Sequence, residues 1–308
     1  AVRLLPRDIK VDDLPYIVDA HHHLWDLEAC RHTWLAERGV IRFFGDPAPI
    51  QKNYHVDDLR ADFGSIPVKK SVHIQVGVEV DDSLNETTWL QAQADTFGLP
   101  TAIVPFCDLT HKTVDVDLEK HTAHSGVRGV RQIIGRSAEE DRKTGTSALL
   151  SDPNFKRGLQ TLADKGLSFD LQLTPPLMQA SANLFAQAPE LKAALCHGGS
   201  LSAHDQDSLA EWKTGLQSLS ELPNVICKLS GFGMFDHNWS MESIAPLVHR
   251  AIEIFGPTRI AFGSNFPVDK LYASYEETMG AYLEICQIYT AAERDAMFRT
   301  VAESFYRI

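Results

Sequence analysis

Three consecutive histidines, His21, His22 and His23, follow a short apolar run and are the part of this chain best suited to chemistry. If residues 17–20 form a β-strand, side chains alternate between its two faces, so His21 and His23 point one way and His22 the other. Two neutral imidazoles on one face can bind the same cation. The pattern therefore predicts a metal ion shared by His21 and His23, and the alternative is a solvated histidine run without such a role.

Eight short apolar segments are predicted to be the strands that position these residues. They span roughly 17–20, 71–77, 101–107, 127–133, 168–173, 191–196, 224–230 and 259–264. Helical patterns lie between them, at about 86–97, 115–123, 153–164, 177–187, 205–221, 241–255 and 274–288. Two pairs have capping-box spacing, Ser274 with Glu277 and Thr290 with Glu293. The repeated alternation without a linker predicts an α/β fold in which residues 1–308 form a single (β/α)8 barrel domain.

The composition restricts where the protein works and what it binds. Its 308 residues are enough for a large core, and the net charge of −12 argues against a nucleic-acid or membrane partner. The five cysteines are widely spaced and contain no CxxC pair, which indicates a reducing compartment. The first seven residues have no apolar run of signal-peptide length, and no segment is long enough to span a membrane. We therefore expect a cytoplasmic protein, and homo-oligomerisation stays open.

A barrel gathers the residues at the carboxyl ends of its strands into one site, so polar residues at these positions are informative. His197 ends the sixth strand segment, and we favour a ligand or catalytic role for it over a structural one. Arg131 and Lys228 each either pair with a buried acid or bind a substrate anion. Asp170 is expected to hold such a buried cation. His73 is expected to form hydrogen bonds inside the barrel, and most histidines of the loops and helices to be solvated.

Three segments that follow strand ends are unusually long, namely 24–55, 134–151 and 231–239. Loops of this length in a compact domain are more often functional than decorative. We expect them to build the site. The substrate that it accepts is expected to depend on the loops at 27–55, 78–85, 134–151 and 231–239.

Seven motifs occur in an order and spacing that resemble the amidohydrolase superfamily, in the amidohydrolase-related branch that contains sugar-acid lactonases. They are DAHHHLW (19–25), ETTWL (86–90), GVR (129–131), FDLQ (169–172), HGG (197–199), KLSG (228–231) and GSNFPV (263–268). The resemblance runs from about residue 16 to the C-terminus. It implies a (β/α)8 barrel with one or two divalent cations. The expected ligands are the two histidines of the His-x-His pattern, histidines after later strands and an aspartate after the eighth.

Carried over to this chain, the resemblance implies that His21, His23 and His197 bind a divalent metal, with zinc as the expected ion. It also implies that Arg131 binds substrate. The branch contains members that look metal-free, so a metal-free site is the alternative.

Two positions depart from the superfamily pattern. Gln172 and Thr174 stand near the end of the fifth strand, where a histidine is usual. Asn265 stands where the superfamily has the aspartate that accepts a proton from the attacking water. An amide cannot take that proton near neutral pH and is a weak ligand.

These features together predict a metal-dependent hydrolase that opens a small lactone of the sugar-acid type. The catalytic candidates are His197, Asn265 and Arg131. The substrate-binding candidates are Arg131, Lys228 and Gln75, and the substrate is expected to be anionic. The alternatives are a lactone isomerase or a decarboxylase on the same barrel, or a barrel that binds a ligand without catalysis.

Overall fold

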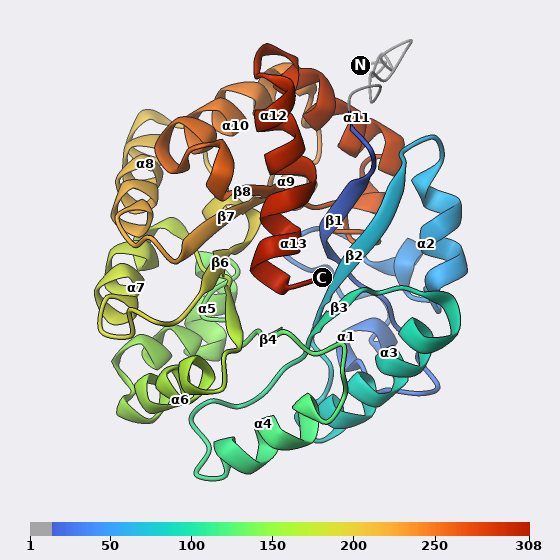
Figure 1. Ribbon diagram of the computed structural model, residues 1–308, viewed down its shortest axis with the longest axis vertical. Helices are drawn as coiled ribbons and strands as arrows, with labels where there is room; N and C mark the ends of the chain where they lie inside the picture. The colour runs from blue at the N-terminus through green and yellow to red at the C-terminus, as the bar shows by residue number, and fades with distance from the viewer. Residues whose placement is uncertain (1–13) are drawn as a thin grey trace.

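The computed structural model describes residues 14–308, in which strands alternate with helices as the sequence predicts (Figure 1). The strands are β1 (Ile17–His22), β2 (Val68–Ile74), β3 (Ala102–Val104), β4 (Gly129–Val130), β5 (Ser168–Leu171), β6 (Ala193–Leu195), β7 (Val225–Leu229) and β8 (Ile260–Phe262). All eight predicted strands are confirmed, although β4 is only two residues long. The first seven residues, on which the expectation of no signal peptide depends, lie outside the described range.

The strands pair in parallel, in the orders β1-β2-β3 and β4-β5-β6-β7-β8. Backbone hydrogen bonds join the two sheets at both seams. Ile103 accepts from Arg128 N and donates to Gly126 O, which links β3 to the segment before β4. At the other seam Asn265 N donates to His21 O at 2.7 Å. These bonds hold the two sheets together at both seams, in the arrangement of a (β/α)8 barrel, and bring the ends of β1 and β8 together.

Helices surround the barrel (Figure 1). The longer ones are α2 (Val56–Phe63), α3 (Ser83–Phe97), α4 (Val114–Thr122), α6 (Pro153–Asp164), α7 (Met178–Phe185), α8 (Gln206–Ser220), α10 (Met241–Phe255) and α11 (Tyr275–Ile285). The shorter ones are α1 (Thr33–Ala36), α5 (Ala138–Thr144), α9 (Phe232–Phe235), α12 (Ala291–Asp295) and α13 (Val301–Tyr306). Both predicted capping boxes are present, at the starts of α11 and α12. Within residues 14–308, no helix is both long and apolar enough to span a bilayer.

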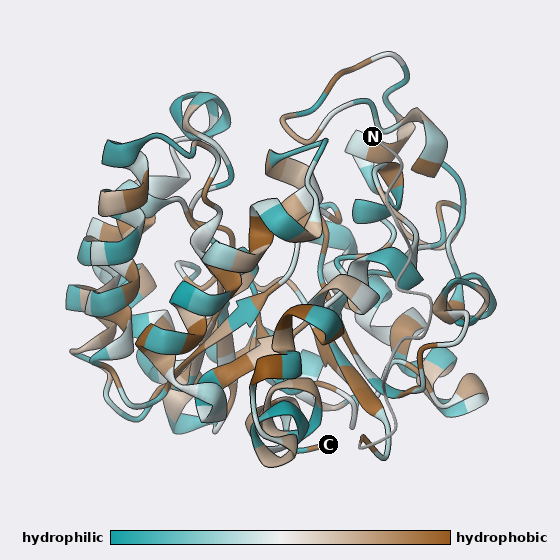
Figure 2. Cartoon of the chain, turned by 90° about the horizontal axis from the view of Figure 1, so that it is seen from above, coloured by the Kyte–Doolittle hydropathy of each residue, from teal (hydrophilic) through white to brown (hydrophobic). Residues whose placement is uncertain are grey.

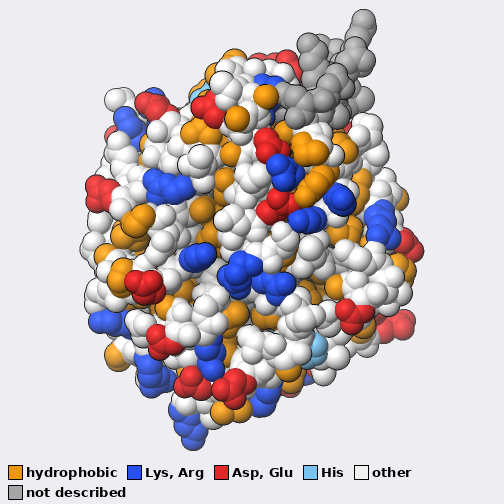
Figure 3. All heavy atoms as spheres, viewed as in Figure 1, with side chains coloured by type: hydrophobic (Ala, Val, Ile, Leu, Met, Phe, Trp, Pro, Cys, Tyr) orange, Lys and Arg blue, Asp and Glu red, His pale blue; other side chains and the backbone are white. Residues whose placement is uncertain are grey.

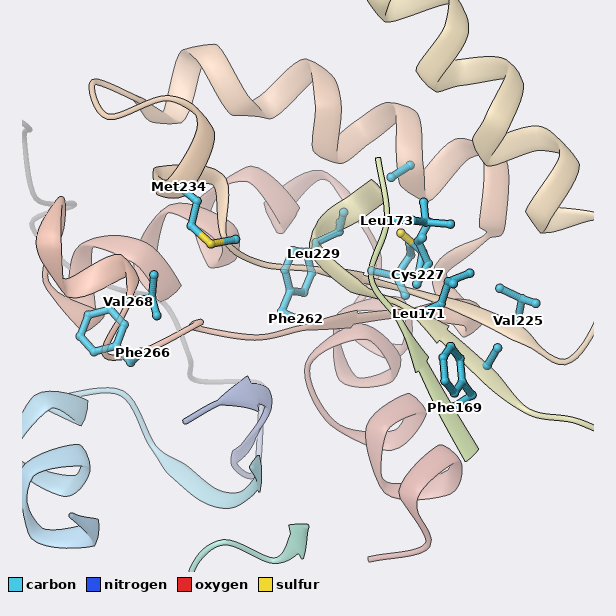
Figure 4. Packing of buried hydrophobic residues seen from close by; sticks show 14 of the residues in the cluster. Phe169, Leu171, Leu173, Val225, Cys227, Leu229, Met234, Phe262, Phe266 and Val268 are labelled. Carbon is cyan, nitrogen blue, oxygen red and sulfur yellow. The ribbon is translucent and has the colours of Figure 1, made fainter. Parts of the chain in front are cut away.

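Alternation along the strands separates the outer core from the barrel interior. Figure 4 shows the odd-numbered residues of β5 and β7 in one apolar cluster, and Phe169 packs edge-on against Phe155 of α6. The even-numbered Asp170 and Lys228 therefore point into the barrel. Hydropathy follows the same division, because the brown, apolar segments of Figure 2 gather in the strands and teal faces lie on the outer helices.

The C-terminal helix α13 packs against the inner apolar residues of the strands and lies across them in Figure 1. Its Tyr306 hydroxyl donates to the Asp170 carboxylate at 2.9 Å. The five cysteines are buried and unpaired. On the face seen in Figure 3, acidic and basic side chains are interspersed, so the net negative charge is not concentrated there.

Candidate active site

A cavity of about 530 Å³ opens where the strands end. Its base is formed by side chains that follow five different strands, namely His23, Arg131, Gln172, His197 and Asn265. Its walls come largely from segments 33–44 and 136–144, which belong to two of the long loops expected to border the site. The cavity thus lies at the end of the barrel that carries the active site in enzymes of this fold, and its size suits a small molecule.

His21, His23 and His197 lie close together at this end of the barrel, where His23 and His197 line the base of the cavity and His21 lies beside both. The ring centroid of His21 lies 5.2 Å from that of His23 and 4.6 Å from that of His197. All three side chains are buried. His22 points away from them, and its Nε2 lies 2.8 Å from Ser71 Oγ. The structure therefore has the alternation predicted for the histidine run.

Hydrogen bonds determine which nitrogen of His23 carries the proton. Its Nδ1 lies 2.7 Å from the carbonyl oxygen of Ile74, which can only accept, so Nδ1 holds the hydrogen. The lone pair of Nε2 then faces Asn265 Oδ1 at 3.1 Å. Neither ring nitrogen of His21 has a hydrogen-bond partner in the described part of the chain. Buried lone pairs that face one another fit a divalent cation, which would replace the missing hydrogen bonds.

Burial keeps the three imidazoles in the neutral form that binds metals. The pKa of each lies well below its ordinary value of 6.5, chiefly because the charged form would lose its hydration. Nearby positive charges act in the same direction, with Lys228 acting on His21 and Arg131 acting on His23 and His197. The nitrogen lone pairs are thus available at neutral pH, as metal binding requires.

A different group of donors, His21, Asp170 and Cys196, has its ligand atoms within 4.8 Å of one another, and among the described residues it is the one group of three such donors that lies this close together. The carboxylate of Asp170 is already occupied, because its Oδ2 lies 2.5 Å from Lys228 Nζ and accepts from the Tyr306 hydroxyl. Burial raises the pKa of the Cys196 thiol to about 11, so the thiolate that binds metals is disfavoured at neutral pH. The histidine cluster at the base of the cavity fits a cation better.

Lys228 does not lie where a substrate-binding residue would. Its side chain is fully buried inside the barrel, where it pairs with Asp170 and donates to the carbonyl oxygen of Ala20 at 3.2 Å. It does not border the cavity. The expected role of Lys228 in substrate binding is therefore corrected to a structural one, since each charge of this pair compensates the other. Asp170 pairs with a buried cation, Lys228, as the sequence led us to expect.

Arg131 lies at the cavity base and is held by neutral groups. Its guanidinium donates from Nη1 to Gln172 Oε1 at 2.7 Å and from Nη2 to the carbonyl oxygen of Gln75. Gln75 in turn donates from Nε2 to Arg131 O at 3.2 Å, so it positions the arginine and does not itself border the cavity. No ion pair joins Arg131 to a carboxylate among the residues described. The guanidinium can therefore bind an anionic group that enters the cavity.

A second arginine, Arg136, lines the cavity wall and was not among the residues expected from the sequence. It is partly buried, and this burial lowers the pKa of its guanidinium. Its place in the long segment after β4 was the signal that could have identified it.

Three histidines differ from expectation. His32 and His121 are buried, although they lie among the histidines expected to be mostly solvated. His73 points out of the barrel toward α3, where its Nε2 lies 3.7 Å from the carboxylate of Glu86. Each of these positions depends on a packing contact with an element distant in the sequence, which periodicity does not reveal.

Comparison with known proteins identifies the family. The amidohydrolase family model matches residues 18–308, nearly the whole chain. The chain belongs to the amidohydrolase family. It is 36% identical over 298 residues to y4mH, an uncharacterized protein of Sinorhizobium fredii, with 95% of this chain and 98% of the relative covered.

Two further relatives of this amidohydrolase come from Burkholderia multivorans. An L-fucono-1,5-lactonase is 25% identical over 304 residues, covering 94% of this chain and 96% of the relative. A solved amidohydrolase structure with bound zinc has a TM-score of 0.80 at 25% identity, covering 95% of this chain and 99% of that chain.

This amidohydrolase departs from the superfamily pattern at Asn265, after β8. The residue has a left-handed backbone with a φ of 56°, which asparagine tolerates better than most residues. Its Oδ1 faces His23, and its Nδ2 lies 3.5 Å from Asp269 Oδ1. Because a carboxylate oxygen accepts hydrogen bonds, Asp269 favours the orientation that directs the amide oxygen toward the histidines. Asn265 can thus accept a hydrogen bond or ligate weakly, but it cannot take a proton.

Proposed function

We propose that this amidohydrolase hydrolyses a small lactone of the sugar-acid type. The observation that carries the proposal is the meeting of two buried, neutral imidazoles, with a third beside them, and a buried arginine at the base of one cavity. The likeness to an L-fucono-1,5-lactonase supports the lactone as substrate class. The two arginines at the base and wall support a substrate that also carries a negative charge.

We further propose that His21, His23 and His197 hold a divalent cation, with zinc as the expected ion. The unpartnered ring nitrogens of His21, the Nε2 lone pair that His23 directs at Asn265 Oδ1 and the zinc bound in the Burkholderia multivorans structure support this assignment. When bound, such an ion polarises a carbonyl oxygen and lowers the pKa of water toward neutrality. In this scheme Asn265 Oδ1 accepts a hydrogen bond from the attacking water and orients it.

Arg131 holds the anionic group of the substrate, and its contacts to Gln172 and Gln75 hold the guanidinium in place. Water adds to the lactone carbonyl, the ring C–O bond breaks, and the ring oxygen ends as a hydroxyl group. Asn265 cannot carry the proton from the water to the ring oxygen. His197 is our candidate for this transfer if it does not ligate the cation, and its Nδ1 lies 3.0 Å from Ser230 Oγ. A His197→Gln variant that keeps its metal but loses rate would show proton transfer, whereas loss of the metal would show ligation.

The test is turnover of a panel of sugar-acid lactones in heavy-oxygen water, with products identified by NMR and mass spectrometry. We expect a hydroxy acid that contains one oxygen from the solvent. Elemental analysis of the same protein identifies the metal, and chelation followed by metal addition should remove and restore activity. Full activity in metal-free protein would contradict the metal assignment.

Asn265 is the observation that favours the alternatives, because it removes the usual proton acceptor. A product without solvent oxygen would indicate an isomerase or a decarboxylase. Inactivity across the panel, together with tight binding of one sugar acid, would indicate a binding protein. The unpaired cysteines support the cytoplasm as our proposed location.

A further inference from the structure

Three buried ionisable side chains, His32, His73 and Glu86, lie outside the cavity, and the proposed function uses none of them. His32 precedes α1, His73 belongs to β2 and Glu86 belongs to α3. The Nε2 atoms of the two histidines lie 3.4 Å and 3.7 Å from Glu86 Oε1, and the side chains are at most 1% exposed. A carboxylate buried this deeply requires a compensating positive charge.

Hydrogen-bond partners show which histidine carries that charge. His73 Nδ1 accepts the backbone N–H of Leu24 at 3.0 Å, so its single proton is on Nε2 and the ring is neutral. His32 is different, because its Nδ1 lies 3.4 Å from the carbonyl oxygen of Cys30 while its Nε2 faces Glu86. Both nitrogens of His32 therefore face atoms that only accept. The geometry of these two contacts is that of an imidazolium with Glu86 as its counterion.

The carboxylate is ionised across the whole range in which the enzyme would work. Although burial raises it, the hydrogen bonds and charges of His32 and His73 hold the pKa of Glu86 at about 2. Replacing Glu86 by a neutral group would therefore leave His32 as an uncompensated buried charge, or force it to lose its proton.

We propose that Glu86 is a positioning residue that holds two parts of the active site at once. The first part is the end of β1. The Leu24 N–H bond to His73 lies beside the bond from His23 Nδ1 to the carbonyl oxygen of Ile74. By keeping the proton of His73 on Nε2, Glu86 keeps Nδ1 free to accept from Leu24, and this fixes the backbone that carries His23.

The second part is the cavity wall. The residues after His32, Thr33 and Trp34, line the cavity, and Trp34 Nε1 donates to the carbonyl oxygen of Val76 at 2.7 Å. The His32–Glu86 pair joins the start of this wall to α3. Glu86 thus couples the wall that contacts substrate to the strand end that carries a proposed metal ligand.

The two parts can be separated by substitution. His73→Gln should weaken zinc binding by roughly 10–100-fold, the usual cost of losing a partner that orients a metal ligand, and should change KM little. His32→Gln should raise KM severalfold and leave zinc affinity near that of the unsubstituted protein. Glu86→Gln should do both. Glu303→Gln is the matched control, because Glu303 also pairs with a cation, Lys70, at 2.7 Å but lies outside the cavity.

The decisive measurement is the protonation of the histidines in ¹⁵N-histidine-labelled protein, observed by two-bond ¹H–¹⁵N correlation. We expect His32 to be protonated on both nitrogens and His73 on Nε2 alone, with His32 losing one proton in Glu86→Gln. A neutral His32 in the unsubstituted protein would overturn the proposal, even if Glu86→Gln fails to fold. So would a folded Glu86→Gln protein with unchanged zinc affinity and unchanged KM.

Only the zinc and KM readouts rest on the proposed function. If the protein binds no zinc and opens no lactone, the proposed function fails while the NMR assignment still stands. If the enzyme is active but His32 is neutral, the proposed function stands and the role of Glu86 fails.

Discussion

The Asn265→Asp substitution tests whether the position after β8 belongs to the metal site. Asn265 Nδ2 lies 3.5 Å from Asp269 Oδ1, so the substitution places two carboxylates about that far apart in a buried setting. At an effective dielectric constant of 20, they repel by about 5 kcal/mol. Without metal, the two carboxylates should share one proton, which raises the pKa of the pair.

A divalent cation reverses this balance. At a ligand distance of about 2.1 Å, its attraction for the new carboxylate is roughly three times the repulsion at the same dielectric constant. We therefore expect the variant to bind zinc roughly tenfold more tightly or better at pH 8. The gain should shrink toward pH 5.5, because the metal must then displace the shared proton. The lactonase kcat should change only modestly, since a good leaving group needs little help from a base.

The assay is zinc competition with a chromophoric chelator at both pH values, with kcat measured on the same samples. Asn85→Asp is the matched control, because Asn85 also donates to a carboxylate, that of Asp82 at 3.0 Å, but lies on the surface of α3. The control should bind zinc like the unsubstituted protein. If Asn265→Asp also has unchanged affinity at pH 8, Asn265 is not near a metal, and the assignment of the histidine cluster falls with it.

Five further substitutions, in three predictions, test the site and its surroundings. His21→Ala and His23→Ala should each abolish zinc binding and activity, whereas His22→Ala should keep most activity. Equal loss in all three variants would show that the alternation of side chains along the histidine run is wrong. Arg131→Ala should lower kcat/KM by about 100-fold on an anionic lactone, because one charge-assisted hydrogen bond of roughly 1.5–3 kcal/mol is lost. If the variant is less stable but its kinetics are unchanged, Arg131 has a structural role. Burial lowers the pKa of His121 to about 4. Between pH 6.5 and pH 4, His121 is therefore protonated in the unfolded chain but neutral in the folded protein. The free energy of unfolding should fall as the pH drops through this range. In urea titrations His121→Gln should remove about 3 kcal/mol of that fall, and an unaltered pH dependence would contradict the buried neutral histidine.

The sequence by itself determined the secondary structure and much of the site. The helices at 153–164 and 241–255 have the predicted bounds, because their apolar stripes are continuous and their ends carry ordinary capping signals. The strands were equally readable, since buried parallel strands are short apolar runs. The likeness to the amidohydrolase motifs then placed His21, His23 and His197 on one side of the fold, where the structure has them.

Some features were not readable from local pattern. Helix α5 lies within the segment expected to be a long loop, and it has no buried residue, so no apolar stripe marks it. The pairing of β1 with β2 shifts register between Asp19 and His22, and such a shift depends on the partner strand. A strict alternation from residue 17 would therefore have misjudged which earlier residues of β1 share the face of His21.

Only the tertiary structure decided the partners of the buried charges. Lys228 was equally suited to a substrate or to an acid until β5 and β7 placed it 2.5 Å from Asp170. His32 and Glu86 are 54 positions apart, and nothing in either segment indicates that they meet. The physical reason is that hydrophobic periodicity reports which face of an element is buried. It does not report which charge lies opposite, because that depends on how distant elements pack.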